Sequence, residues 1–119
     1  MDKDTLELVE KAVKLLDKKK AVDITAFEIS ELTVIADCFI IASGTSSVHV
    51  RSLADDLEAG LEQDGIRPRA VEGKTSGWIL LDYGALVVHI FTPDQRAFYD
   101  LERLWQDAPH VDVAAMIGE

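Results

Sequence analysis

The run that most constrains the fold is SGWILLDYGALVVHIFT, residues 76–92. Two apolar segments flank Tyr83-Gly84, a pair suited to a tight turn, so the run predicts a β-hairpin. With the turn at these two residues, the predicted pairs are Asp82 with Ala85, Leu80 with Val87, and Trp78 with His89. Residues that pair directly share a face, so the sequence separates the two faces of the hairpin.

The two predicted faces differ in chemistry. One is wholly apolar and is expected to face the core: Ile79, Leu81, Leu86, Val88 and Ile90. The other adds a carboxylate and an imidazole to large apolar groups: Trp78, Leu80, Asp82, Ala85, Val87, His89 and Phe91. An uncovered patch of this kind typically marks an interface, and tryptophan is enriched at binding hot spots. The alternative is that a helix covers this face as well.

The rest of the chain predicts elements in the order α-β-β-α-β-β-β-α. Helices are expected at 4–19, from Ser46 or Ser47 to Gly65, and from Thr92 onward, and further strands at 22–27, 37–43 and 68–72. These elements predict an α/β fold over residues 1–119: a single domain with a mixed sheet of about five strands flanked by helices. The strand–helix step at 37–64 favours at least one right-handed parallel crossover.

The last helix has a clear start signal. Thr92 is the expected N-cap, Pro93 suits the first helical position, and Gln95 completes a capping box. Three apolar residues are expected on one face of this helix, serving the core or self-association: Phe98, Leu101 and Trp105.

Charge is distributed unevenly along the chain. The formal net charge is −10, from 12 basic and 22 acidic residues. Residues 1–20 hold six lysines and five acids, a balance of +1, which leaves −11 for the remainder. Such an acidic body disfavours direct nucleic-acid binding and suits basic protein surfaces, although the charge also serves simple solubility. One cysteine and no apolar run near ~20 residues favour a cytoplasmic protein with no membrane partner.

No motif in the sequence assembles a convincing active site. SGTSS, residues 43–47, resembles a nucleotidyltransferase entry loop, but Asp82 is followed by Tyr83-Gly84 and lacks the second carboxylate that two-metal chemistry needs. The three histidines do not fall at metal-ligand spacing, and Cys38 lies inside an apolar strand, which is typical of a core thiol. We therefore expect no enzyme activity, no metal and no cofactor, and helix capping explains SGTSS better.

Four segments together resemble the ribosomal silencing factor family, also called Iojap-like. They are ADCFIIASGTSS at 36–47, EG at 72–73, GWILLDYGALVVHIF at 77–91 and RAFYDLERLW at 96–105. The combined order is specific, although no single piece is. Two positions depart from the family pattern: His49, where glutamine is common, and Ala85, where an acid often follows the turn glycine. The second departure removes one charge near the expected interface.

The resemblance implies a translation repressor with no enzymatic role and a nucleotidyltransferase-like core without catalytic carboxylates. Such a protein is expected to bind the large ribosomal subunit through that subunit's fourteenth protein and to block joining of the small subunit. The alternatives are a small nucleotidyltransferase-like, nucleotide-binding enzyme and a homodimer whose hairpin face meets itself.

Seven residues are the candidate partner-binding site: Lys74, Trp78, Leu80, Asp82, His89, Arg96 and Tyr99. Trp78 is expected to be the anchor. Asp82 is expected to pair with a basic residue of the partner, or else to fold back on Lys74, which otherwise reaches a partner acid. His89 either serves the interface or hydrogen-bonds Asp82. Arg96 and Tyr99 lie one helical step apart and are expected to border the same patch.

Overall fold

The computed structural model describes residues 1–74 and 76–118; Thr75, within the predicted polar loop 73–77, and Glu119 lie outside them. The helices are α1 Lys3–Lys18, α2 Ser47–Glu62, α3 Pro93–Tyr99, α4 Leu101–Leu104 and α5 Val113–Met116. The strands are β1 Val22–Glu28, β2 Cys38–Ser43, β3 Ala70–Glu72, β4 Trp78–Asp82 and β5 Leu86–Phe91.

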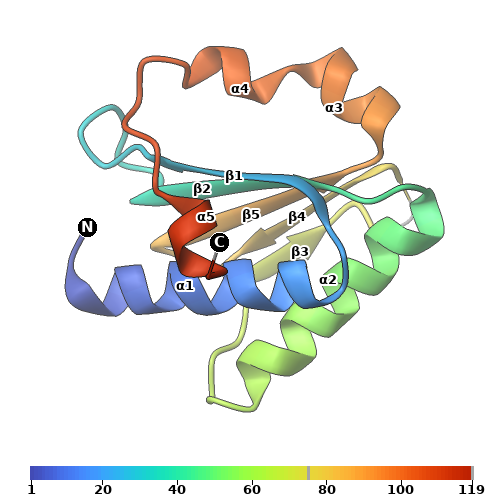
Figure 1. Ribbon diagram of the computed structural model, residues 1–119, viewed down its shortest axis with the longest axis horizontal. Coiled ribbons are helices and arrows are strands. Elements are labelled where there is room, and N and C mark those ends of the chain that lie inside the picture. Colours follow the sequence, from blue (N-terminus) through green and yellow to red (C-terminus); the bar gives the residue numbers. More distant parts are fainter. Residues whose placement is uncertain (75, 119) are drawn as a thin grey trace.

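The strands form one mixed sheet in the order β1-β2-β5-β4-β3. β2 and β5 run parallel, and the other neighbouring pairs are antiparallel. In Figure 1, α1 and α2 lie on one side of the sheet and α3 and α4 on the other. The predicted α/β class, the strand count and the parallel crossover are confirmed.

The hairpin register differs from the prediction by two residues. Trp78 pairs with Phe91 and Leu80 with His89, because the turn lies at Gly84-Ala85, where Gly84 has φ +86°. The Tyr83 N–H closes the turn on the Leu86 carbonyl at 2.8 Å. Side chains alternate with period two, so a shift of two residues leaves every side chain on its predicted face.

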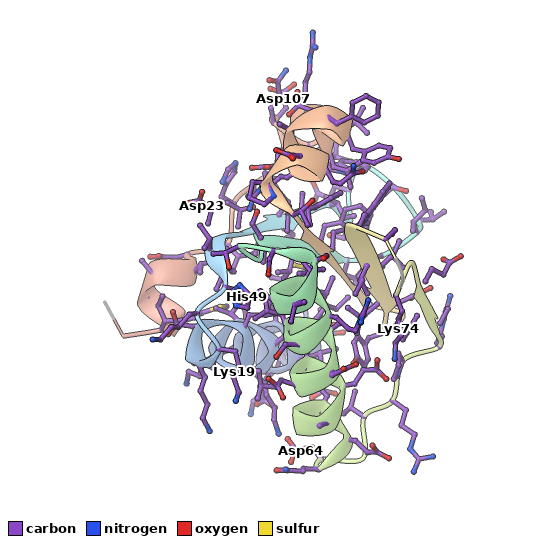
Figure 2. The ribbon with its side chains drawn as sticks, turned by 90° about the vertical axis from the view of Figure 1, so that its right-hand side faces the viewer. Lys19, Asp23, His49, Asp64, Lys74 and Asp107 are labelled. Carbon is purple, nitrogen blue, oxygen red and sulfur yellow. The ribbon has the colours of Figure 1, made fainter. Side chains whose placement is uncertain are left out.

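The two long helices begin and end on local signals in the sequence. The Ser46 Oγ accepts the His49 N–H at 3.2 Å and caps α2, as one of the two predicted serines was expected to do. Gly65, at φ +75°, follows the helix end, and the Ile66 N–H donates to the Leu61 carbonyl in a Schellman closure. The His49 Nε2 lies 2.9 Å from the Lys19 carbonyl and thereby ties α2 to the end of α1 (Figure 2).

The predicted last helix is broken, and its capping box does not form. Asp100 adopts a left-handed conformation with φ 47° and separates α3 from α4, so Phe98 does not share a helix face with Leu101 and Trp105. Thr92 is the N-cap and Pro93 is at the first helical position, but the Thr92 side chain makes no cap bond. The backbone of Gly77 packs against the Thr92 and Gln95 side chains instead.

Two apolar clusters lie on opposite sides of the sheet. The larger, between the sheet and α1 and α2, takes up the whole predicted core face: Ile79, Leu81, Leu86, Val88 and Ile90. The smaller lies on the α3–α4 side and centres on Phe27, Phe39, Ile41, Val87 and Phe91, with Trp78, Leu80, Leu101 and Trp105 packed at its margin. Helices therefore cover both faces, but the second one only in part.

Candidate protein-binding site

Trp78 is a half-buried aromatic side chain held in place on several sides. Its ring stacks on Phe91 with centroids 5.0 Å apart and meets Tyr99 of α3 at 4.5 Å. Its indole N–H donates to the Nδ1 of His89 at 3.1 Å. A side chain fixed in this way loses little conformational entropy on binding, which is what an interface anchor requires.

His89 lies beneath Trp78, where it is only 3% exposed. Burial lowers the pKa of its imidazole to about 4, so the ring is neutral near pH 7. Accepting the indole hydrogen at Nδ1 places the imidazole proton on Nε2. The suggested hydrogen bond from His89 to Asp82 is absent from the described contacts: Nδ1 accepts from Trp78, and the buried Nε2 has no partner among the described residues. His89 is therefore a support for the anchor, out of direct reach of a partner.

Asp82 and Lys74 do not pair with each other. Asp82 accepts the Gly84 N–H at 2.8 Å and lies 3.4 Å from the Arg69 guanidinium. Lys74 reaches the opposite side of the sheet, where its Nζ lies 3.2 Å from Glu58 and 3.8 Å from Asp55 of α2. The Asp82–Arg69 contact was missed from the sequence, since it depends on how β3 pairs with β4.

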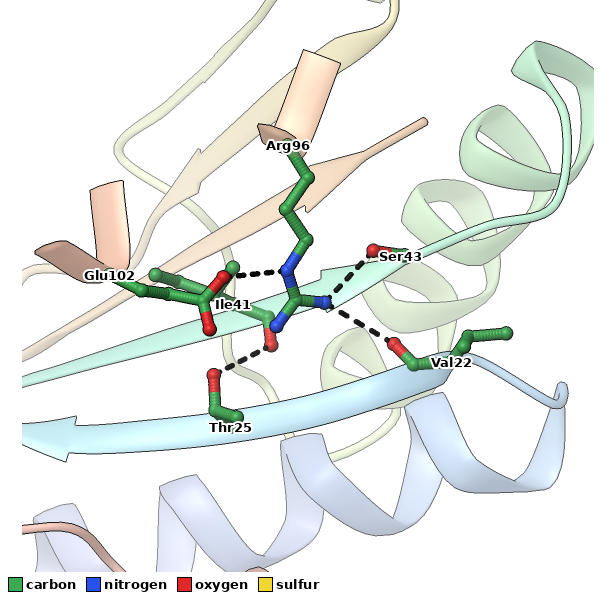
Figure 3. Close-up of polar contacts among 6 residues, drawn as sticks. All are labelled: Val22, Thr25, Ile41, Ser43, Arg96 and Glu102. Atoms are coloured by element: carbon green, nitrogen blue, oxygen red, sulfur yellow. Dashed lines mark hydrogen bonds and ion pairs between the residues drawn. The ribbon is translucent and has the colours of Figure 1, made fainter. Parts of the chain in front are cut away.

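The Arg96 side chain points toward the ends of β1 and β2 (Figure 3). Its Nε lies 2.8 Å from Glu102, and its guanidinium also donates to the Ser43 Oγ at 2.8 Å and to the Val22 carbonyl at 3.5 Å. The side chain is 13% exposed. Arg96 therefore fastens α3 and α4 to the ends of β1 and β2, and it does not border the same patch as Tyr99.

Four predicted site residues remain together on one accessible area, which we call the Trp78 surface: Trp78, Leu80, Asp82 and Tyr99. The first three alternate along β4 on one face, and Tyr99 contacts Trp78 from α3. Trp78, Leu80 and Asp82 are half-buried, and Tyr99 is 45% exposed. Phe98, beside Tyr99, is 77% exposed and extends the aromatic area.

The side chains considered above for catalysis or metal binding occupy structural positions in the described part of the chain. No cluster of three or more metal-ligating side chains occurs within residues 1–74 and 76–118. Cys38 is fully buried, and burial raises the pKa of its thiol to about 12. Ser46, in the SGTSS run, caps α2. The fold and site thus define a small mixed-sheet α/β domain with a prearranged aromatic surface.

The particular family follows from comparison with known proteins. Residues 2–118 match the family model described as ribosomal silencing factor during starvation, and the chain belongs to that family. The description of the family supports a ribosome-associated silencing role.

Individual relatives agree with this assignment. The chain is 39% identical over 113 residues to a protein of Halalkalibacterium halodurans named ribosomal silencing factor RsfS, covering 94% of this chain and 97% of that one. It is 31% identical to the mouse protein named mitochondrial assembly of ribosomal large subunit protein 1, over 92% of this chain and half of that one. A crystal structure from Chromobacterium violaceum superposes with a TM-score of 0.84 at 34% identity, over 89% of this chain and 88% of that one.

A helix must be both long and apolar to cross a lipid bilayer. Within residues 1–74 and 76–118, no helix combines the length and the apolar character needed to cross one.

Proposed function

We propose that this protein represses translation by binding the large ribosomal subunit through the Trp78 surface, with the subunit's fourteenth protein as its direct partner. Occupying that site blocks joining of the small subunit by steric exclusion. The observation that carries the proposal is the prearranged Trp78, stacked on Phe91 and hydrogen-bonded to His89 while its outer side stays accessible.

Three further observations support this proposal. The family description names a ribosomal silencing factor, and the mouse relative's name refers to assembly of the ribosomal large subunit. The net charge of −10 favours encounter with a basic ribosomal protein over direct contact with RNA phosphates. Asp82, at the end of the Trp78 surface, accepts the Gly84 N–H and forms its ion pair within the described residues with the exposed Arg69, a contact that it can exchange for a basic residue of the partner.

The test is sedimentation of the purified protein with ribosomal subunits through a sucrose gradient. The wild-type protein is expected to migrate with the large subunit and to reduce the joined 70S-type peak. Trp78→Ala is expected to weaken binding by roughly 30-fold or more, since buried anchor residues contribute about 2 kcal/mol or more. Val48→Ser, at a 73% exposed position on α2, is the matched control and is expected to bind normally.

Two outcomes contradict the proposal. Wild-type protein that stays at the top of the gradient would refute ribosome binding, and nucleotide binding would be tested next. Trp78→Ala that binds normally, with an unchanged circular dichroism spectrum, would refute the Trp78 surface as the contact.

A further inference from the structure

A second accessible apolar group projects from the loop between β1 and β2. In this loop, residues 29–37, three large aliphatic side chains face solvent within four positions: Leu32 is 55% exposed, Val34 103% and Ile35 67%. Exposing several neighbouring aliphatic side chains is unfavourable in water, and such groups commonly mark a contact surface. The contacts described for the Trp78 surface do not involve these three side chains.

The loop is a fixed structure rather than a loose connection. Ile29 is fully buried and Ala36 is 6% exposed, so both ends are packed in the smaller cluster. The Ile29 N–H donates to the Asp37 carbonyl at 2.9 Å and closes the loop at its base. At the tip, the Thr33 N–H donates to the Ile29 carbonyl at 3.1 Å, and the Thr33 Oγ1 accepts the Ile35 N–H at 3.2 Å. The exposed side chains are thus displayed by an ordered backbone.

An acidic hollow adjoins this apolar tip. It has a volume of about 410 Å³ and is lined by Glu28, Ser30, Glu31, Leu32, Asp107 and Pro109. Glu31 and Asp107 are exposed, and no ion pair of either is found within residues 1–74 and 76–118. Glu28, the third carboxylate of the lining, is paired with the Met1 ammonium at 2.7 Å. An apolar tip beside the other two carboxylates suits a protein surface that carries both aliphatic and basic side chains.

The base of the loop lies next to the Asp82 end of the Trp78 surface. Trp78 begins β4 and Asp82 ends it, next to the hairpin turn. The Asp37 N–H, at the base of the loop, donates to the turn carbonyl of Ala85 at 2.8 Å. β4 is about 16 Å long at its strand rise, and a standard interface covers about 800 Å² on each partner. A partner that covers Asp82 therefore also lies near the loop.

We propose that the loop tip, Leu32, Val34 and Ile35, is a second contact for the same basic protein that the Trp78 surface binds, with a lysine or arginine of that protein entering the acidic hollow. This inference rests on the proposed function and deepens it. The carboxylates disfavour RNA, an anionic lipid surface and a second copy of this acidic chain as the occupant, because each would place like charges together.

The test compares Val34→Ser/Ile35→Ser with Val48→Ser and Trp78→Ala in binding to purified large subunits. The replaced loop side chains are exposed, so the variant is expected to fold normally. Its affinity is expected to fall by about tenfold or more, as for removal of aliphatic contacts from an interface. Glu31→Gln/Asp107→Asn is expected to weaken binding and to flatten its dependence on salt.

The outcomes separate this inference from the function on which it rests. Loss of binding in Trp78→Ala with normal binding in the loop variant would overturn the loop contact and leave the proposed function intact. Absence of binding by the wild-type protein would overturn both. A wild-type mass that rises with concentration, and falls to that of a monomer in the loop variant, would assign the loop to self-association and overturn the proposal.

Discussion

The two faces of the sheet are built differently. The face toward α1 and α2 is sealed by two 16-residue helices, each with five buried residues. The face toward α3 and α4 is covered by two short helices, neither of which has a fully buried residue. The first face carries stability. The second leaves aromatic side chains accessible and holds them through a few directed contacts, which is the arrangement expected of a binding surface. Four predictions test this division.

The largest effect is expected from truncating leucines on the two faces. Leu57 of α2 is 1% exposed within the larger cluster, so Leu57→Ala is expected to lower the free energy of unfolding by about 4 kcal/mol. Leu80→Ala, on the partly covered face, is expected to lower it by only about 1 kcal/mol but to weaken large-subunit binding. Urea denaturation and gradient sedimentation measure the two effects, and equal losses of stability would contradict the division.

The second prediction concerns pH and His89. Burial lowers the folded-state pKa of His89 to about 4 from an ordinary value of 6.5. The unfolded chain therefore binds a proton before the folded one does. Stability from this group is complete above pH 6.5 and is lost as the pH falls toward 4, by about 3 kcal/mol in all. Urea denaturation of wild type and His89→Leu across this range isolates the effect, and two parallel curves would contradict it.

The third prediction concerns Arg96, which fastens α3 and α4 to the ends of β1 and β2. Arg96→Ala leaves Glu102 and Ser43 without their partner, and the free energy of unfolding is expected to fall by about 2 kcal/mol. Hydrogen exchange is expected to accelerate in α3 and α4 but not in α1. Equal acceleration of hydrogen exchange in α1, α3 and α4 would show that α3 and α4 do not open independently of the rest of the fold.

The smallest effect is expected from Trp78→Phe. This substitution keeps an aromatic ring on Phe91 but removes the N–H donor to His89, at a cost of about 1 kcal/mol in stability. Binding is expected to weaken less than in Trp78→Ala, because an aromatic ring remains, although it is smaller and less firmly oriented. Calorimetric titration of both variants and the wild type against large subunits measures the difference. Wild-type affinity of Trp78→Phe would show that the orienting hydrogen bond contributes nothing, and an affinity equal to that of Trp78→Ala would show that the remaining ring contributes nothing.

The features predicted correctly from the sequence are those that depend on the periodic spacing of apolar residues. Sequence reasoning assigned the hairpin residues to the correct faces even though the turn was misplaced, since a shift of two residues preserves alternation. It missed the break at Asp100, because the spacing of apolar residues does not reveal a single left-handed residue, even one such as aspartate that tolerates this conformation. It also grouped Arg96 with Tyr99. Their spacing predicts proximity on a helix, but not that the long arginine side chain turns back to Ser43 and Glu102.

The C-terminal segment has a consequence for solubility. Residues 109–111 run along the free edge of β1, where the Glu28 N–H donates to the Pro109 carbonyl and the Val111 N–H to the Ala26 carbonyl. Open strand edges recruit further strands and lead to aggregation, while β3 at the opposite edge spans only three residues. Residues 109–111 thus cover the edge of β1 and hinder its pairing with a strand of another copy.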